Sequence, residues 1–353
     1  MAARIQAFEA EQEKSQGFRW PTLLAIVLGA VLLGAGVLLF VSAHWEELAP
    51  SSRFTLVLLM VALLHGGGAL ASGRYQSLAI SLHAVGTVAL GAGIALTGQI
   101  FNLAEHWPAG ILLWAVGAAF AWAILRHWAQ ATLVAVLTPA WLVSEWIYAA
   151  VDPELGPVTA GVSLLAFTYL SARGPVKDGP FRQALAWTGG LVLLPSVAGM
   201  VFGASEVRDH TDSGHRALSW FVALGLPLAV AFLLRRRDAW MNAVCAAWVV
   251  VAALSPANGA RFEVPVPVFE YFWCGLGAVG LIAWGVRDSR AERINLGRAG
   301  FAITVLAFYF SSVMDKLDRS ASLIGLGVLF LAGGWALEKM RRRLVARVRP
   351  GAV

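Results

Sequence analysis

Charged residues are scarce in this chain. Asp, Glu, Lys and Arg make up 14% of its 353 residues, against about 25% in a typical soluble domain, while 58% are hydrophobic. Apolar runs long enough to cross a bilayer as a helix, which takes about 20 residues, recur along the whole chain. The alternating ten-residue pattern of a transmembrane β-barrel is absent. The composition excludes an ordinary soluble domain and predicts an all-α, polytopic integral membrane protein.

Cysteines are few, and the common catalytic signatures are absent. The two cysteines, Cys245 and Cys274, both fall in apolar runs and are expected toward opposite leaflets, so they are predicted to be buried apolar residues without a disulfide. No HExxH, CxxC, P-loop or GxSxG is present. GLGAVG at 275–280 resembles a dinucleotide fingerprint but lies inside an apolar run with no strand before it. No catalytic residue, cofactor or metal site is predicted, and an enzyme is not favoured.

The net charge of +6 comes from basic residues in the predicted loops. No basic face exists apart from these loops, so no nucleic-acid partner is expected. The basic stretches at 235–237 and 287–298 are interpreted as cytoplasmic anchors that face anionic lipid headgroups.

Twelve membrane spans are predicted from the apolar runs. They cover residues 21–43, 54–72, 77–97, 109–125, 129–150, 158–172, 184–203, 217–234, 239–254, 268–286, 299–314 and 321–338. The sixth, ninth and eleventh are short, and as tilted or partly re-entrant segments they leave ten or eleven true spans open. The predicted organisation is a short cytoplasmic segment (1–20), a five-helix region (21–150), a region of about seven helices (151–338) and a basic cytoplasmic tail (339–353).

The basic residues also predict the orientation. Of the 27 Lys and Arg residues, 21 fall in the N-terminus, the even-numbered loops and the C-terminus. The positive-inside rule therefore places both termini in the cytoplasm. The run at 21–43 is longer than the apolar part of a signal peptide, so it is interpreted as a retained first span.

Small residues recur at four-residue spacing in the third span. Ala89, Gly93 and Thr97 share one helix face there. Such faces let helix backbones approach closely in lipid, so this one is interpreted as a packing face, with a dimer interface as the alternative.

A polar stretch, TGQIFNLAEHW, follows the third span at 97–107. If the helix continues past Gly98, then Gln99, Asn102 and His106 share one face, and Pro108 begins the next helix. The stretch is predicted to lie where the chain leaves the lipid on the outer side. Its polar residues are interpreted either as a hydrogen-bonded helix end or as part of a ligand or ion site.

Three ionisable residues lie deeper in the predicted spans, namely His65, His83 and Glu145. Such residues are costly in hydrocarbon and usually face the bundle interior. For the histidines, a hydrogen bond to a neighbouring helix is favoured over a ligand role. For Glu145, a proton- or cation-coupled role and a simple interfacial position stay equally open, and it is expected to approach Gln99 or His44. The predicted candidate polar site is therefore Gln99, Asn102, His106, Glu145 and His44.

Two of these polar motifs carry a family resemblance. Ala43-His44-Trp45 follows the first span, and Gly98-Gln99-Ile100-Phe101-Asn102-Leu103 follows the third. In this order and spacing they resemble the DUF2157 family of predicted bacterial membrane proteins, over roughly residues 20–145. His44 and Phe101 depart from the usual Asn and Tyr of that family. The resemblance implies a multi-pass protein of the bacterial cytoplasmic (inner) membrane and implies no chemistry.

Two functional interpretations remain open at this point. The first is a transporter or permeation-type protein with a polar site near the outer face. The second is a non-catalytic sensor, scaffold or complex subunit, which would bind a membrane-protein partner or a second copy of itself. An intramembrane enzyme acting on lipid-linked substrates is less favoured, because only the loops around His44 and His106 could supply its catalytic groups.

Overall fold

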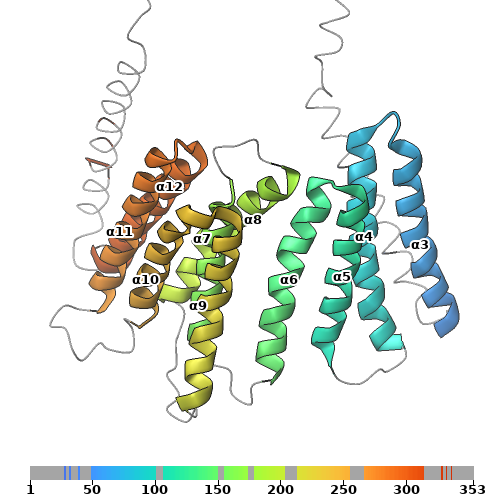
Figure 1. Cartoon of the computed structure of the whole chain (residues 1–353), viewed down its shortest axis with the longest axis horizontal. Coiled ribbons are helices and arrows are strands. Elements are labelled where there is room, and N and C mark those ends of the chain that lie inside the picture. Colours follow the sequence, from blue (N-terminus) through green and yellow to red (C-terminus); the bar gives the residue numbers. More distant parts are fainter. Residues whose placement is uncertain are drawn as a thin grey trace, which may run out of the picture. The chain divides into compact units, whose positions relative to one another are not determined.

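The structure is a computed structural model that describes residues 49–100, 106–149, 155–173, 179–202, 213–254 and 266–313, with a few isolated positions outside these ranges. Every regular element in the described residues is a helix (Figure 1). The chain divides into two compact units, residues 1–105 and 106–353. The prediction of an all-helical protein is confirmed for the described part of the chain.

The first unit contains an antiparallel pair of long helices, α3 (Pro50–Ala71) and α4 (Gln76–Ile100), joined by a short turn. A Cβ atom added at Gly93 of α4 would collide with the side chain of Val57 on α3. The predicted packing face of the third span therefore does hold the two helices close together at Gly93.

The second unit contains the remaining described helices. They are α5 (Trp107–Leu125), α6 (Trp128–Ala149), α7 (Leu155–Leu170), α8 (Pro180–Phe202), α9 (Ser213–Arg235), the 3-10 helix η1 (Arg236–Ala239), α10 (Trp240–Leu254), α11 (Val266–Arg287), α12 (Ala291–Phe308) and the π-helix η3 (Tyr309–Val313). Three tight turns in this unit use a residue with positive φ: Arg126 (54°), Arg236 (53°) and Ser289 (56°). All three turns fall on the predicted cytoplasmic side, where they reverse the chain within a few residues.

The short helix α7 is the centre of the second unit. It packs against α8, α9 and α10, and its apolar residues Leu164, Phe167 and Leu170 belong to the largest buried cluster. With 16 residues it is about 24 Å long, less than the roughly 30 Å thickness of the hydrocarbon core. The prediction noted this span as short, and in the structure the surrounding helices, rather than lipid, cover most of its surface.

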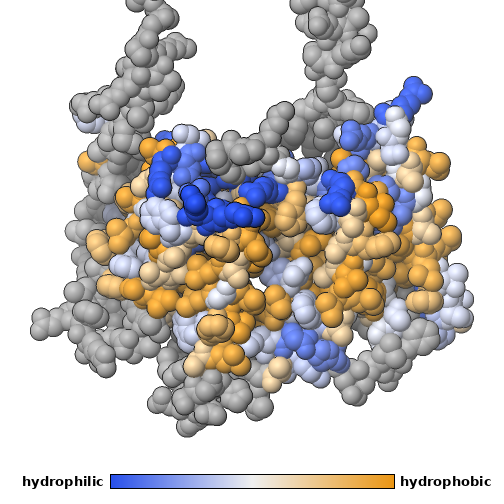
Figure 2. Space-filling view, viewed as in Figure 1, coloured by the Kyte–Doolittle hydropathy of each residue, from blue (hydrophilic) through white to orange (hydrophobic). Residues whose placement is uncertain are grey.

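Large apolar side chains point outward from the other helices. Leu113, Phe120, Leu191, Phe221 and Leu233 are each more than half exposed. Figure 2 shows hydrophobic residues over the middle of the helices and hydrophilic ones gathered near their ends. Eight helical stretches of the described residues are long and apolar enough to cross a membrane, and one of them, 217–253, contains the turn between α9 and α10. An apolar outer surface of this kind is consistent with the hydrocarbon core of a membrane as its surroundings.

Ten of the twelve predicted spans coincide with a described helix. The first and last, 21–43 and 321–338, lie outside the described residues, so the total of twelve stays a prediction. The eleventh span was placed too late in the chain: α12 begins at Ala291, not at residue 299. Residues 291–298 were assigned to a loop because of their charges. In the structure they are helical, and one of their charged residues, Arg293, is buried and paired with Asp288.

Candidate functional site

His106 and Glu145 meet at neighbouring ends of α5 and α6. The Nε2 atom of His106 lies 2.9 Å from Oε1 of Glu145, and both side chains are partly exposed, at 45% and 38%. Tyr148 stands one helical turn after Glu145, and its ring meets the His106 ring edge-on at 4.6 Å between centroids. The contact places an acid and an imidazole together at the predicted outer end of the two helices.

The sequence predicts how this site is built. Pro108 stands in the first turn of α5, as expected for a helix start, and His106 is the residue just before the helix. Pro at this position needs no backbone donor, so the helix begins directly after the polar stretch and leaves the His106 side chain at its end.

For the other members of the predicted polar site, the structure gives no position relative to this pair. Gln99 lies in the last turn of α4, in the first unit, and its side chain is not described. His44 and Asn102 lie outside the described residues. An approach of Glu145 to Gln99 or His44 therefore stays a prediction.

His65 of α3 and His83 of α4 face each other inside the first unit. Their Nδ1 atoms are 3.1 Å apart, and the ring centroids are 5.3 Å apart. His83 is only 5% exposed. Each of these intramembrane histidines therefore has a partner on the neighbouring helix.

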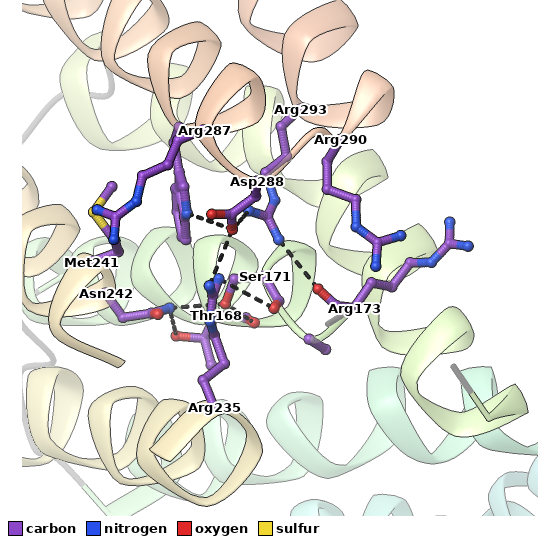
Figure 3. A network of polar contacts seen from close by, with 12 residues as sticks. Thr168, Ser171, Arg173, Arg235, Met241, Asn242, Arg287, Asp288, Arg290 and Arg293 are labelled. Carbon is purple, nitrogen blue, oxygen red and sulfur yellow. Dashed lines mark hydrogen bonds and ion pairs between the residues drawn. The ribbon is translucent and has the colours of Figure 1, made fainter. Parts of the chain in front are cut away.

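A cluster of arginines lies at one end of the second unit, around the C-terminus of α7 (Figure 3). Arg182 of α8 donates to the carbonyl of Ala172, and Arg235 of α9 donates to that of Ser171. Arg293 of α12 donates to the carbonyl of Arg173. These three carbonyls belong to the residues directly after Leu170, where α7 ends, and the C-terminus of a helix carries partial negative charge, so cations stabilise this end. Three helices thus each supply one arginine to the turn that follows a fourth.

Asp288 supplies the counter-charge of this cluster. A single carboxylate oxygen of Asp288 accepts from Arg235 at 3.1 Å, from the indole of Trp284 at 3.0 Å and from Arg293. Both guanidiniums also lie near the Trp284 ring, with their central carbons 5.3 and 4.6 Å from its centroid. Burial alone would raise the pKa of Asp288, but the hydrogen bonds and charges of the two arginines outweigh it and lower that pKa below its usual value.

The position of Arg293 corrects part of the sequence interpretation. The stretch 287–298 was predicted to be a cytoplasmic loop of basic anchors, yet Arg293 is completely buried, with 0% of its surface exposed. It lies on one face of α12 with the buried glycines Gly297 and Gly300. This helical spacing of an arginine and two small residues is the signal that could have predicted an inward-facing side chain.

Further polar contacts join the same end of the unit. The side-chain amide of Asn242 on α10 donates to the hydroxyl groups of Ser171 and Thr168, and all three residues are buried. Glu292 lies 3.5 Å from Arg173 and 3.9 Å from Arg290. The predicted sixth, eighth and tenth loops are therefore tied together, which identifies this cluster as a structural clamp.

A groove of about 450 Å³ runs between α11 and α12, lined by apolar residues such as Phe272, Leu276 and Phe301. The polar residues of its lining are Tyr271 and Thr304, and their hydroxyl groups already hydrogen-bond to Ser311 and to the Gly300 carbonyl. Within the described residues, no group of three or more His, Cys, Asp or Glu side chains is placed to hold a metal ion. Cys245 and Cys274 are free thiols in or against the main buried cluster.

Comparison with known proteins agrees with the resemblance seen in the sequence. Residues 1–148 match the model of the DUF2157 family, described as a predicted membrane protein. No curated protein matches the chain, and no solved structure matches it. The matched part includes the His65–His83 pair and the His106–Glu145 contact. It supports a membrane location without indicating an activity.

Proposed function

We propose that this protein transports or conducts a proton or a small cation, and that His106 and Glu145 form its coupling site at the outer face. The observation that carries the proposal is the 2.9 Å contact between His106 Nε2 and Glu145 Oε1. Placing an ionisable group in or near a membrane span costs free energy, and such groups usually have a function. Because both side chains are partly exposed, an arriving proton or cation can reach them.

The chemistry follows from competition at one carboxylate. When His106 is protonated, it forms an ion pair with the Glu145 carboxylate. A proton or cation that binds Glu145 neutralises its carboxylate and weakens this ion pair. The ends of α5 and α6 are then free to separate. The predicted outer loops are rich in Asp and Glu, which raises the local concentration of cations at this face.

We further propose that the chain crosses the bacterial inner membrane about twelve times with both termini in the cytoplasm. The uneven distribution of Lys and Arg supports this orientation. It is also supported by the clustering of the predicted sixth, eighth and tenth loops at one end of the second unit. Exposed basic side chains there, such as Arg236 and Arg237, are proposed to face anionic lipid headgroups.

The test is ion flux into proteoliposomes that contain the purified full chain. Proton, sodium and potassium fluxes are compared in the wild type, Glu145→Gln and His106→Gln. The proposal expects flux in the wild type, its loss in Glu145→Gln, and an altered pH dependence in His106→Gln. Thermal unfolding in detergent establishes that each variant is folded.

Glu270→Gln is the matched control, because Glu270 is a carboxylate in the first turns of α11, the predicted outer end of that helix. It should keep the wild-type flux. Equal loss of flux in both glutamate variants would contradict a special role for Glu145. Absence of flux for all three ions in the wild type would reject the proposal and favour a sensor or subunit role.

A further inference from the structure

We propose that His65 and His83 form a second site, separate from His106 and Glu145, which binds one proton between α3 and α4. The two imidazoles meet through their Nδ1 atoms at 3.1 Å, a distance at which one nitrogen donates and the other accepts. Both residues lie inside the apolar spans, and His83 is almost completely buried.

The two helices build this site reciprocally. Each has a glycine three residues after its histidine: Gly68 follows His65, and Gly86 follows His83. A Cβ atom at Gly68 would lie 2.8 Å from Nε2 of His83, and one at Gly86 would lie 2.9 Å from Nε2 of His65. Each imidazole therefore occupies the space that the glycine of the opposite helix leaves open, and the two glycines let the tilted rings approach through their Nδ1 atoms.

The geometry limits the pair to one added proton. In the neutral pair, one histidine carries its proton on Nδ1 and donates to the bare Nδ1 of the other. Adding a proton produces an imidazolium that donates to a neutral ring, a stronger charge-assisted bond. A second proton would place two N–H groups and two positive charges against each other at 3.1 Å, so the pair titrates as a unit and resists double protonation.

Proton binding fits the surroundings better than metal binding does. The other charged or titratable side chains of α3, α4 and their connecting turn are Arg53, Arg74 and Tyr75, all near helix ends or in the turn. Within these described helices, no Cys, Asp or Glu is present to complete a metal site, and zinc takes three or four protein ligands.

The experiment is nitrogen NMR on the full chain, labelled with ¹⁵N-histidine and reconstituted in lipid. His65→Gln and His83→Gln assign the signals among the seven histidines. We expect a coupling between the two Nδ1 atoms through their hydrogen bond, and uptake of only one proton by the pair as the pH is lowered. The coupling itself is measured in the wild type, so this part of the test does not require the variants to fold.

Glycine variants provide matched controls on the same helices. Gly68→Ala and Gly86→Ala should abolish the coupling and let the two histidines titrate independently. Gly66→Ala should preserve the coupling, since nothing lies within 4 Å of a Cβ atom at that position.

Two results would overturn the proposal. One is independent titration of His65 and His83 in the wild type, with two protons taken up. The other is stoichiometric binding of Zn²⁺ that shifts both histidine signals at micromolar metal, which would make the pair a metal site. These readouts measure protonation rather than flux, so they stand or fall separately from the transport proposal.

Discussion

The guanidinium of Arg293 is completely buried, and it lies against the carboxylate of Asp288, five residues earlier in the chain. The turn between α11 and α12 makes this possible, because Ser289 adopts a φ of 56° and reverses the chain between the two residues. Arg235 arrives from another helix and shares the same carboxylate oxygen. One acid thus neutralises part of the charge of two buried bases at the end of the bundle.

Removing the acid should destabilise the protein strongly. Asp288→Asn leaves Arg235 and Arg293 without their counter-charge, and breaking a buried pair in this way typically costs about 3–5 kcal/mol. We expect a large fall in the midpoint of thermal unfolding in detergent. Glu292→Gln is the control, because its pairs are partly exposed and should contribute less than about 1 kcal/mol. Equal effects of the two changes would show that Asp288 has no special role.

Acid should weaken the same clamp. The pKa of Asp288 is lowered below its ordinary value of 3.8 in the folded protein, so its contribution to stability is fully present above about pH 4. The contribution is lost as pH falls through the lower, folded pKa. The difference in unfolding midpoint between the wild type and Asp288→Asn should therefore shrink below pH 4. A difference that stays constant from pH 7 to pH 3 would contradict the assignment.

Two glycines of α8 should respond differently to substitution by alanine. A Cβ atom at Gly189 would lie 2.5 Å from the carbonyl oxygen of Ala166 on α7, so Gly189→Ala must push the helices apart at a cost of about 1–3 kcal/mol. Nothing lies within 4 Å of a Cβ at Gly199, so Gly199→Ala should be neutral or stabilise by up to about 1 kcal/mol through helix propensity. Unfolding midpoints of both variants test this, and a stable Gly189→Ala protein would refute the close approach.

Two tryptophans join α10 and α11 through reciprocal hydrogen bonds. The indole of Trp248 donates to the carbonyl of Trp273 at 3.2 Å, and the indole of Trp273 donates to the carbonyl of Trp248 at 3.1 Å. Trp248→Phe removes one of these donors and should cost about 1 kcal/mol. Trp187→Phe is the control, since that ring is 65% exposed and should change the unfolding midpoint little. Similar losses in both would mean that the indole bond contributes nothing.

The helices themselves could be predicted closely from the sequence. A run of about twenty apolar residues forms a helix in lipid, because a helix satisfies the hydrogen bonds of every backbone group within the segment. For this reason α3 to α11 lie within a few residues of the predicted spans. The failure at α12 has the same origin. Hydropathy counts Arg293 as a charge outside the span, whereas in the structure its charge is paired with Asp288 in the preceding turn.

The sequence predicted which residues belong to the candidate sites but not which residues they contact. His65, His83 and Glu145 stand out in the sequence because an ionisable group is unusual at membrane depth. Their partners depend on how neighbouring helices are rotated. That rotation is set by glycines such as Gly68 and Gly86, whose meaning appears only when the opposite helix is in place.

The sequence by itself determined the class of the protein and the course of most spans, because hydropathy acts on each segment separately. Only the tertiary structure decided that His65 meets His83, that His106 meets Glu145, and that arginines from three helices converge on the turn after α7. These contacts join residues up to 120 positions apart, and no local rule selects one such pairing among many. The packing of small residues between helices selects it, by setting which side chains come within bonding distance.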